Sequence, residues 1–460
     1  PVCNRLMIRQ PQSINGLRLP PFFLRSSEVM PVTLEAARAA ALSAIDEQRG
    51  TLISLSKFIH SNPETGLQEY KSSGACMDFL GEHGFEIERD VAGLETAFAA
   101  RAGFDGPTIG YLAEYDALAG IGHGCGHNLI AIANLAAGLG LKRAIEQGLP
   151  GRAVVFGTPA EESFGGKAIM AKAGAFNELD AALGAHPGTG EAACPTVEGS
   201  GRSLARQEFL IAFHGKPAHA AGDPYNGINA LDALTMFYNG VSALRQQTTT
   251  DARFHGIITD GGDAPNVIPH YAATKYRARA ATIGYMETLI EKVQRIGEGA
   301  ALMTGCRFEF VRTVEPYFDM ITNHTLARQV KTHLDALGFE QPDATPEEPA
   351  GSTDWGNASY VAPSVETSFP IMTGTCTWHS QAVVDASDTD FAYDNTITVA
   401  KALALTGIDL IFNPDLLTAV RAEFEQSLHD RQAAGEGEVL RGRDPEQKHR
   451  ADRAKYSEGH

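Results

Sequence analysis

Gly122-His123-Gly124-Cys125-Gly126-His127-Asn128-Leu129 is the run around which the rest of this 460-residue chain is organised. It follows an apolar segment that ends at Ala113 and precedes an alanine-rich segment that extends to Leu141. If the short piece is extended, Cys125 and His127 project to the same side of the backbone. Thiolate and imidazole are ligands that transition metals bind well. We therefore expect half of a metal site here, although a glycine-rich turn with a buried, inert cysteine would have the same sequence.

Composition indicates a soluble globular protein with two or three domains. The chain has 38 basic and 56 acidic residues, a formal net charge of −18, which argues against nucleic acid and membrane as partners. Six cysteines are scattered over the whole length, so we expect no disulfide framework and a cytoplasmic location. No run approaches the roughly 20 apolar residues that a transmembrane helix needs, so none is expected.

The first thirty residues differ from the rest. Residues 1–30 are rich in Arg, Pro and Ser and have no apolar core long enough for a secretory signal. We expect a disordered or non-native extension, with Met30 as the natural start of the protein.

Predicted strands and helices alternate through the first half of the chain. A helical apolar rhythm covers residues 33–58, and residues 108–113 and 152–158 have the composition of buried strands. Polar clusters follow these strands. Such alternation predicts the α/β class, with a central open mixed sheet flanked by helices and ligands at the carboxyl ends of its strands.

The pattern changes in the middle of the chain. From residue 199 the order becomes strand, helix, strand, strand, helix, strand, which is typical of a ferredoxin-like α+β domain. The first pattern resumes after Glu315. We therefore predict a catalytic domain in two parts, residues 31–198 and 314–425, with an inserted lid and dimerisation domain at 199–313. Residues 426–460 form a charged tail, and the chain is expected to fray from about Glu423.

Three further candidate ligands lie where predicted strands give way to loops. They are Glu162, His186 and His379. A single histidine is more often structural than a ligand, but together with Cys125 and His127 these residues form a set of five. Five ligands, one of them bridging, would hold two divalent cations about 3.5 Å apart, an arrangement suited to amide hydrolysis.

Two carboxylates beside this set have expected roles of their own. In Glu161-Glu162 the side chains should diverge, so that Glu162 binds metal and Glu161 acts as general base. The alternative is a solvated acidic pair at the start of a helix. Asp116 suits a residue that accepts a hydrogen bond from a ligand histidine, although it is also compatible with an aspartate that caps a turn.

Five motifs in order resemble those of a known family. They are Asp116-Ala117-Leu118 followed by the central run, Pro159-Ala160-Glu161-Glu162 with Gly165-Gly166, Gly184-Ala185-His186-Pro187, the pair His214-Gly215-Lys216-Pro217-Ala218-His219 and Gly262-Asp263-Ala264-Pro265-Asn266, and Ser352-Thr353-Asp354. The family is that of cocatalytic-metal amidohydrolases and peptidases, which includes aminoacylases, glutamate carboxypeptidases and auxin-conjugate hydrolases. Within it, the chain most resembles the branch of dipeptidases and of the p-aminobenzoyl-glutamate hydrolase B subunit.

The resemblance implies two divalent metal ions in each copy of the chain, zinc or manganese. Cys125 would replace the bridging aspartate of the carboxypeptidases, and Glu161 would be the general base. The loop that precedes His379 does not align with the family's spacing, so His379 is the weakest ligand of the set. His123, inside the central run, is the alternative ligand.

The inserted domain would complete the site in the family's manner. His219 would stabilise the oxyanion and, in a homodimer formed through the lid, would be lent by the partner subunit. Asn266 and Arg279 would hold the substrate carboxylate or polarise its carbonyl, with Arg277 as the alternative arginine.

These observations together predict a metal-dependent amidohydrolase that acts on small acyl-amino acids or dipeptides. A second hypothesis is a catalytically silent relative that only binds metal or peptide. A third takes Cys125 as a nucleophile paired with His127 or His123, and would make the activity sensitive to alkylation but not to chelators.

Overall fold

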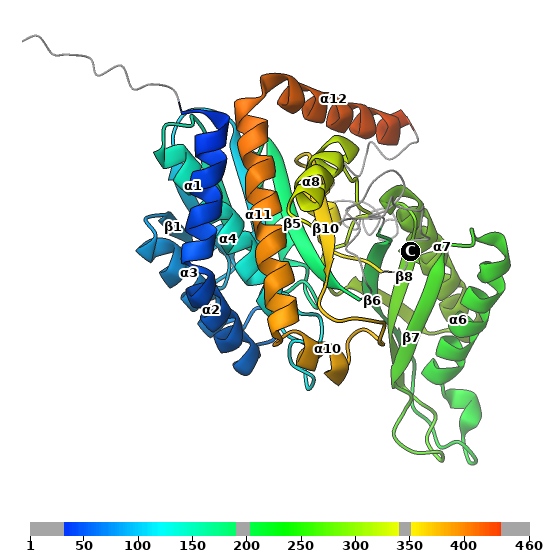
Figure 1. Cartoon of the computed structure of the whole chain (residues 1–460). Helices are drawn as coiled ribbons and strands as arrows, with labels where there is room; N and C mark the ends of the chain where they lie inside the picture. Colours follow the sequence, from blue (N-terminus) through cyan, green and yellow to red (C-terminus); the bar gives the residue numbers. More distant parts are fainter. Residues whose placement is uncertain (1–31, 190–202, 340–350, 434–460) are drawn as a thin grey trace, which may run out of the picture. The chain divides into compact units, whose positions relative to one another are not determined.

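The structure is a computed structural model that describes residues 32–189, 203–339 and 351–433 (Figure 1). The predicted N-terminal extension and all of the predicted charged tail after residue 433 lie outside the described residues. The predicted domain boundaries at 198/199, 313/314 and 425/426 stay predictions.

A six-stranded mixed sheet forms the centre of the catalytic part. Its strands in spatial order are β1 (Glu86–Arg89), β2 (Phe98–Gly103), β4 (Arg152–Gly157), β3 (Thr108–Ala113), β5 (Ala181–Gly188) and β10 (Ser364–Pro370). The β4–β3–β5–β10 half is parallel, and β1 and β2 add antiparallel pairs at one edge. The carboxyl ends of β3, β4 and β5 therefore meet at one edge of the sheet, as expected for the α/β class.

Helices surround this sheet. They are α1 (Leu34–Glu47), α2 (Arg49–Ser61), α3 (Tyr70–Glu82), α4 (His127–Glu146), α5 (Gly166–Lys172), α8 (His324–Ala336), α9 (Trp355–Ser359), α10 (Gln381–Ala386), α11 (Asp390–Phe412) and α12 (Pro414–Arg431). A short 3₁₀ turn, Val91–Gly93, follows β1.

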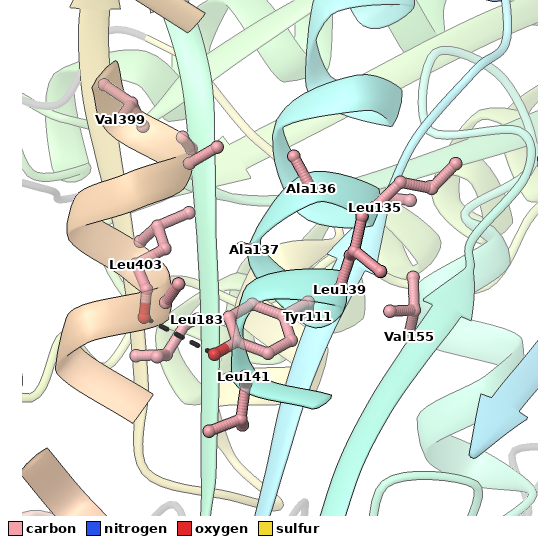
Figure 2. Close-up of a cluster of buried hydrophobic side chains, with 14 of the residues drawn as sticks. Tyr111, Leu135, Ala136, Ala137, Leu139, Leu141, Val155, Leu183, Val399 and Leu403 are labelled. Atoms are coloured by element: carbon pink, nitrogen blue, oxygen red, sulfur yellow. Dashed lines mark hydrogen bonds between the residues drawn. The ribbon is translucent and has the colours of Figure 1, made fainter. Parts of the chain in front are cut away.

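Helix α4 fixes the position of the central run because it packs along β3, β4 and β5 (Figure 2). Successive strand residues serve opposite faces: Tyr111 joins the core under α4 and α11, whereas its neighbour Leu112 joins a second core on the other face, which α5 and α9 help to form. Gly138 lets α4 approach closely, since a Cβ there would lie 2.2 Å from a methyl carbon of Val155.

Side-chain caps mark the starts of several helices. Thr33, Asn323, Thr389 and Asn413 each accept a hydrogen bond from a first-turn amide of α1, α8, α11 and α12, respectively. Such a cap typically stabilises a helix by about 1 kcal/mol. One prediction was wrong: the helix expected over 33–58 is two helices, which meet at Gln48, where the backbone leaves helical geometry with ψ near 3°.

One expectation about the last two helices also fails, namely that the chain frays from about Glu423. Helix α11 has the length and the apolar composition that could cross a membrane. However, 78% of its most apolar stretch is buried inside the protein, because α11 packs against α1, α4 and α8. Helix α12 continues beyond Glu423, where fraying was predicted. The Glu423 carboxylate accepts hydrogen bonds from the backbone amides of His324 and Thr325, which ties α12 to the start of α8.

The inserted domain is a four-stranded antiparallel sheet with two helices. Its strands are β6 (Ala205–His214), β7 (Arg253–Asp260), β8 (Tyr271–Ala280) and β9 (Arg307–Arg312), and its helices are α6 (Ala230–Leu244) and α7 (Ile283–Thr304). Two 3₁₀ turns lie at Pro224–Asn226 and Arg245–Gln247. The spatial order β7-β8-β6-β9 is that of a ferredoxin-like fold, so the predicted architecture is confirmed.

Candidate metal centre

The five predicted ligands come from four segments at one edge of the large sheet. Cys125 and His127 lie at the entrance of α4, Glu162 lies in the turn after β4, His186 is on β5, and His379 lies in the loop before α10. Gly126, with φ of +74°, turns the chain into α4 between the first two. The central run therefore turns at Gly126 instead of being extended, yet both side chains reach the same place.

The structure brings all five ligands together in three overlapping groups. Cys125 with His127 and His186, Cys125 with Glu162 and His379, and His127 with Glu162 and Glu161 each have ligand atoms within 4.8 Å of one another. The Cys125 sulfur lies 3.5 Å from His186 Nε2, and Glu162 Oε1 lies 3.2 Å from His379 Nε2. Groups of ligands that share members are the pattern expected for two neighbouring cations.

Hydrogen bonds fix which nitrogen of each buried histidine is available. His127 Nδ1 donates to Asp116 Oδ1 at 2.8 Å, and the second oxygen of Asp116 accepts from the backbone amide of Glu162 at 3.0 Å. His186 Nδ1 donates to the carbonyl oxygen of Pro187 at 2.7 Å. The lone pairs of both Nε2 atoms therefore face the cluster, which is how surrounding groups normally orient metal-binding histidines. Asp116 occupies the position proposed for it.

The electrostatics of the cluster fit a bound cation. His127 Nε2 is buried without a hydrogen-bond partner. Burial alone would lower the pKa of His127, but Cys125 and Asp116 raise it well above its ordinary value, so the surroundings favour positive charge there. Burial would raise the pKa of Glu162, yet the hydrogen bond with His379 and the charge of His127 hold it at about 2. These residues therefore suit divalent cations.

The surroundings of Cys125 fit a metal ligand better than a free nucleophile. Burial raises the pKa of its thiol to about 12, whereas a reactive cysteine has a lowered pKa. Coordination to a cation deprotonates a thiol. The indole N–H of Trp378 points at the sulfur from 3.2 Å, a donor that would stabilise negative charge on it. The raised pKa of the thiol argues against the alternative of a Cys125 nucleophile.

Glu161 lies beside the ligands rather than apart from them. Its carboxylate groups with His127 and Glu162, and the separate roles expected for the two glutamates stay predictions. In the turn that carries them, Ala160 has φ of +61°, which a β-strand continuation would not allow. Burial and the charge of nearby Glu162 raise the pKa of Glu161 well above its ordinary value.

Two contacts hold this turn in place. The Glu69 carboxylate, fully buried, accepts a hydrogen bond from the Ala160 amide at 2.9 Å. The Tyr317 hydroxyl donates to the carbonyl oxygen of Glu161 at 2.6 Å. Strain of about 1–3 kcal/mol at a residue such as Ala160 persists only where neighbouring structure enforces it, and it concentrates at functional sites.

A buried ion network that was not predicted from the sequence lies behind the ligands. Lys167, with no exposed surface, places Nζ 2.8 Å from Glu114 Oε1 and 2.5 Å from Asp354 Oδ1. The other oxygen of Glu114 lies 3.4 Å from His127 Nε2. The signal was present in the sequence, because Glu114 is two residues before Asp116 and Lys167 follows the Gly-Gly pair, but nothing local indicated that they meet.

The predicted lid residues stand apart from this cluster. His219 and Asn266 are exposed and neighbours of each other, since the Ala220 amide donates to the Asn266 carbonyl. Among the described residues, none of the metal-site groups includes either of them. Arg279 is closer to the catalytic part: its Nη1 donates to the Ser352 hydroxyl at 2.8 Å.

The two alternative residues are engaged elsewhere. His123 is buried and its Nε2 lies 3.1 Å from the carbonyl oxygen of Ile59, and in the part of the chain that the structure describes it joins none of the metal-site groups. Arg277 forms an ion pair with Glu208, with Nε 2.7 Å from Oε2.

Comparisons with known proteins identify relatives over most of the chain. The sequence model of the M20 peptidase dimerisation domain matches residues 206–301. The chain is 38% identical over 420 residues to the mouse Xaa-Arg dipeptidase, covering 87% of this chain and 94% of that protein. It is 30% identical over 455 residues to the B subunit of the p-aminobenzoyl-glutamate hydrolase of Escherichia coli K12, covering 83% and 94%.

The fold is also that of a solved structure. A dinuclear metal-binding peptidase of the M20 family from Bacillus subtilis superposes with a TM-score of 0.54 at 23% identity, covering 77% of this chain and 98% of that one. The extent of the sequence matches decides the assignment: this chain belongs to the M20 family of metal-dependent peptidases and amidohydrolases.

Proposed function

We propose that this chain is a metal-dependent hydrolase that cleaves the amide bond of N-acyl or aminoacyl amino acids, such as dipeptides and aroyl-glutamate-like compounds. The observation that carries this proposal is the convergence of the five predicted ligands around Glu161. The relatives support the same reaction class, because their names describe a dipeptidase and an aminobenzoyl-glutamate hydrolase.

Cys125, His127, Glu162, His186 and His379 are the residues that would hold two divalent cations, zinc or manganese. Bound there, such cations supply Lewis acidity, which polarises an amide carbonyl and lowers the pKa of a water molecule.

Glu161 is the residue that moves the proton in this proposal. Its carboxylate takes a proton from the attacking water and gives it to the nitrogen of the leaving amine. Its raised pKa suits the task, since a carboxylate with an ordinary pKa would hold the transferred proton too weakly between the two steps.

His219 is proposed as the donor to the oxyanion, lent by the second copy of the chain in a homodimer. Its Nδ1 accepts hydrogen bonds from the backbone amides of Ala221 and Gly222, at 3.2 and 3.0 Å. The neutral ring must then carry its proton on Nε2, so that this N–H is free to donate. Removing one donor of this kind typically lowers turnover about 10²–10³-fold.

The substrate carboxylate is proposed to bind Arg279 together with Asn266. Arg279 is suited to this because the hydrogen bond that its guanidinium makes goes to the neutral hydroxyl of Ser352 and leaves other donors for an anion. A cytoplasmic location remains a prediction, which rests on the scattered cysteines.

The experiment begins with chelated, metal-free enzyme to which zinc or manganese is returned. N-acetyl, N-aroyl and dipeptide substrates are then compared for amide cleavage. Glu161→Gln should keep the metal content and lower kcat by about 10²–10⁴-fold, because only the proton transfer is lost. Glu88→Gln, an exposed glutamate on edge strand β1, is the matched control and should retain full activity.

Two outcomes would contradict the proposal. Full activity of Glu161→Gln would remove Glu161 from the mechanism. Activity that survives chelation but not thiol alkylation would instead favour the Cys125 nucleophile.

A further inference from the structure

Arg206 and Arg279 stand directly opposite each other on neighbouring strands of the lid sheet. The antiparallel register of β6 and β8 pairs the two residues. Side chains of directly opposed residues project from the same face of a sheet. Alternate residues of β6, such as Phe209 and Ile211, are buried in the core beneath α6 and α7, so Arg206 lies on the face away from these helices.

In the described part of the chain, neither arginine of this pair forms an ion pair with a carboxylate. Arg206 is only 5% exposed, and its Nε and Nη2 have no hydrogen-bond partner. Its guanidinium lies 3.6 Å from the centre of the Tyr317 ring. Like charges directly opposed on a sheet are unfavourable, and a buried cation without a partner is more so.

Most other arginines in the strands of this sheet have an acidic partner. Arg277 pairs with Glu208 at 2.7 Å, Arg312 with Glu287 at 2.5 Å, and Arg307 lies 3.5 Å from Glu309. The exception among the described strand residues is Arg253, which the register places on the other side of Arg279 and which donates to backbone carbonyl oxygens. Arg253 is exposed, so that water solvates its charge, whereas Arg206 is buried. Two unpaired guanidiniums that lie side by side form a binding site for anions.

The pair lies next to the proposed catalytic turn. Tyr317, on which Arg206 stacks, donates its hydroxyl to the carbonyl oxygen of Glu161. Arg279 donates to Ser352, two residues before the buried Asp354. An anion held by these arginines would therefore belong to the substrate whose amide bond is beside Glu161.

We propose that Arg206 and Arg279 together select a leaving amino acid with a carboxylate side chain, glutamate or aspartate. Arg279 holds the α-carboxylate and Arg206 the side-chain carboxylate. A basic side chain would be repelled. This inference rests on the proposed function and decides between the two substrate types that the relatives' names suggest.

The test compares N-acyl-glutamate with its neutral isostere N-acyl-glutamine and with N-acyl-arginine, by kcat/KM. The wild type should favour glutamate over glutamine by about 10- to 100-fold, the range for hydrogen bonds between charged groups. Arg206→Met should bring this ratio close to one, mainly by raising KM for N-acyl-glutamate. The kcat/KM for N-acyl-glutamine should change little. Arg206→Lys should restore part of the preference. Arg307→Met, the same substitution on the same sheet, is the control that keeps the ratio.

Several results would overturn the inference. A wild type that hydrolyses these substrates without preferring glutamate, or that prefers arginine, excludes it without any variant. If Arg206→Met lowers kcat/KM equally for N-acyl-glutamate and N-acyl-glutamine, Arg206 acts only through Tyr317.

If no substrate is cleaved, the proposed function fails and binding decides the inference. Free glutamate should then raise the Tm of the wild type more than glutamine does, and Arg206→Met should lose the difference. Equal shifts for the two amino acids would refute the anion site.

Discussion

Glu69→Gln tests whether the turn that carries Glu161 rests on a buried, proton-sensitive carboxyl group. Glu69 has no exposed surface; Oε1 accepts a hydrogen bond from the Ala160 amide and Oε2 accepts one from the Thr96 hydroxyl, both at 2.9 Å. Burial, and after it the charge of Asp116, raises the pKa of Glu69 from 4.5 to about 7. The folded protein therefore binds this proton more tightly than the unfolded chain.

The magnitude follows from the size of that shift. A rise in pKa from 4.5 to about 7 corresponds to roughly 3 kcal/mol in the free energy of unfolding. Since the pKa is raised in the folded state, this contribution is fully present below pH 4.5 and is lost as the pH rises through about 7. Glutamine imitates the protonated carboxyl and keeps an acceptor for the Ala160 amide. Relative to the wild type, the variant should therefore gain roughly 3 kcal/mol between about pH 4.5 and about pH 8.

Urea unfolding of the metal-free protein, followed by fluorescence at several pH values, measures this difference. Glu95→Gln, which changes an exposed glutamate bonded to the Tyr70 hydroxyl, is the matched control and should follow the wild type. If the stability curves of wild type and Glu69→Gln run parallel over this pH range, the buried carboxyl group does not titrate as described and the reasoning is refuted.

Two further substitutions test the surroundings of the ligands. Lys167→Met leaves Glu114 and Asp354 without their cation and should lower the free energy of unfolding in urea by about 3–5 kcal/mol. The control Lys172→Met breaks an exposed ion pair and should lower it by less than about 1 kcal/mol. Similar losses for the two variants would contradict a buried network. Cys125→Ala should lower the metal-to-protein ratio measured by elemental analysis, and an unchanged ratio would exclude Cys125 as a ligand.

Much of the fold could be predicted because it depends on local pattern. Alternating strands and helices indicated the mixed sheet, and the order of elements indicated the ferredoxin-like insertion, which the antiparallel pairing of β6, β8 and β9 bears out. What failed depended on tertiary contacts. Glu423 holds α12 against the start of α8, so the helix continues past the residue where fraying was expected. Helix α11 is apolar because it is buried in the core.

The candidate site could also be predicted only in part. The five ligands could be proposed because cysteine, glutamate and histidine at strand ends have a recognisable chemistry. The backbone between Cys125 and His127 was left open by the sequence, and Gly126 turns the chain between them. Lys167 and Asp354 could not be paired from the sequence, because 187 positions separate them and each alone is an ordinary charged residue.

Trp378 gives the protein a built-in optical reporter. The chain has two tryptophans, and the indole of one touches the Cys125 sulfur, while the other, Trp355, is packed against Gly184 with no exposed surface. Thiol and thiolate differ in how strongly they quench indole emission. Replacing Trp355 by phenylalanine would leave a single emitter at the centre, so that loading with a spectroscopically silent ion such as zinc could be followed continuously, without substrate and without labelling.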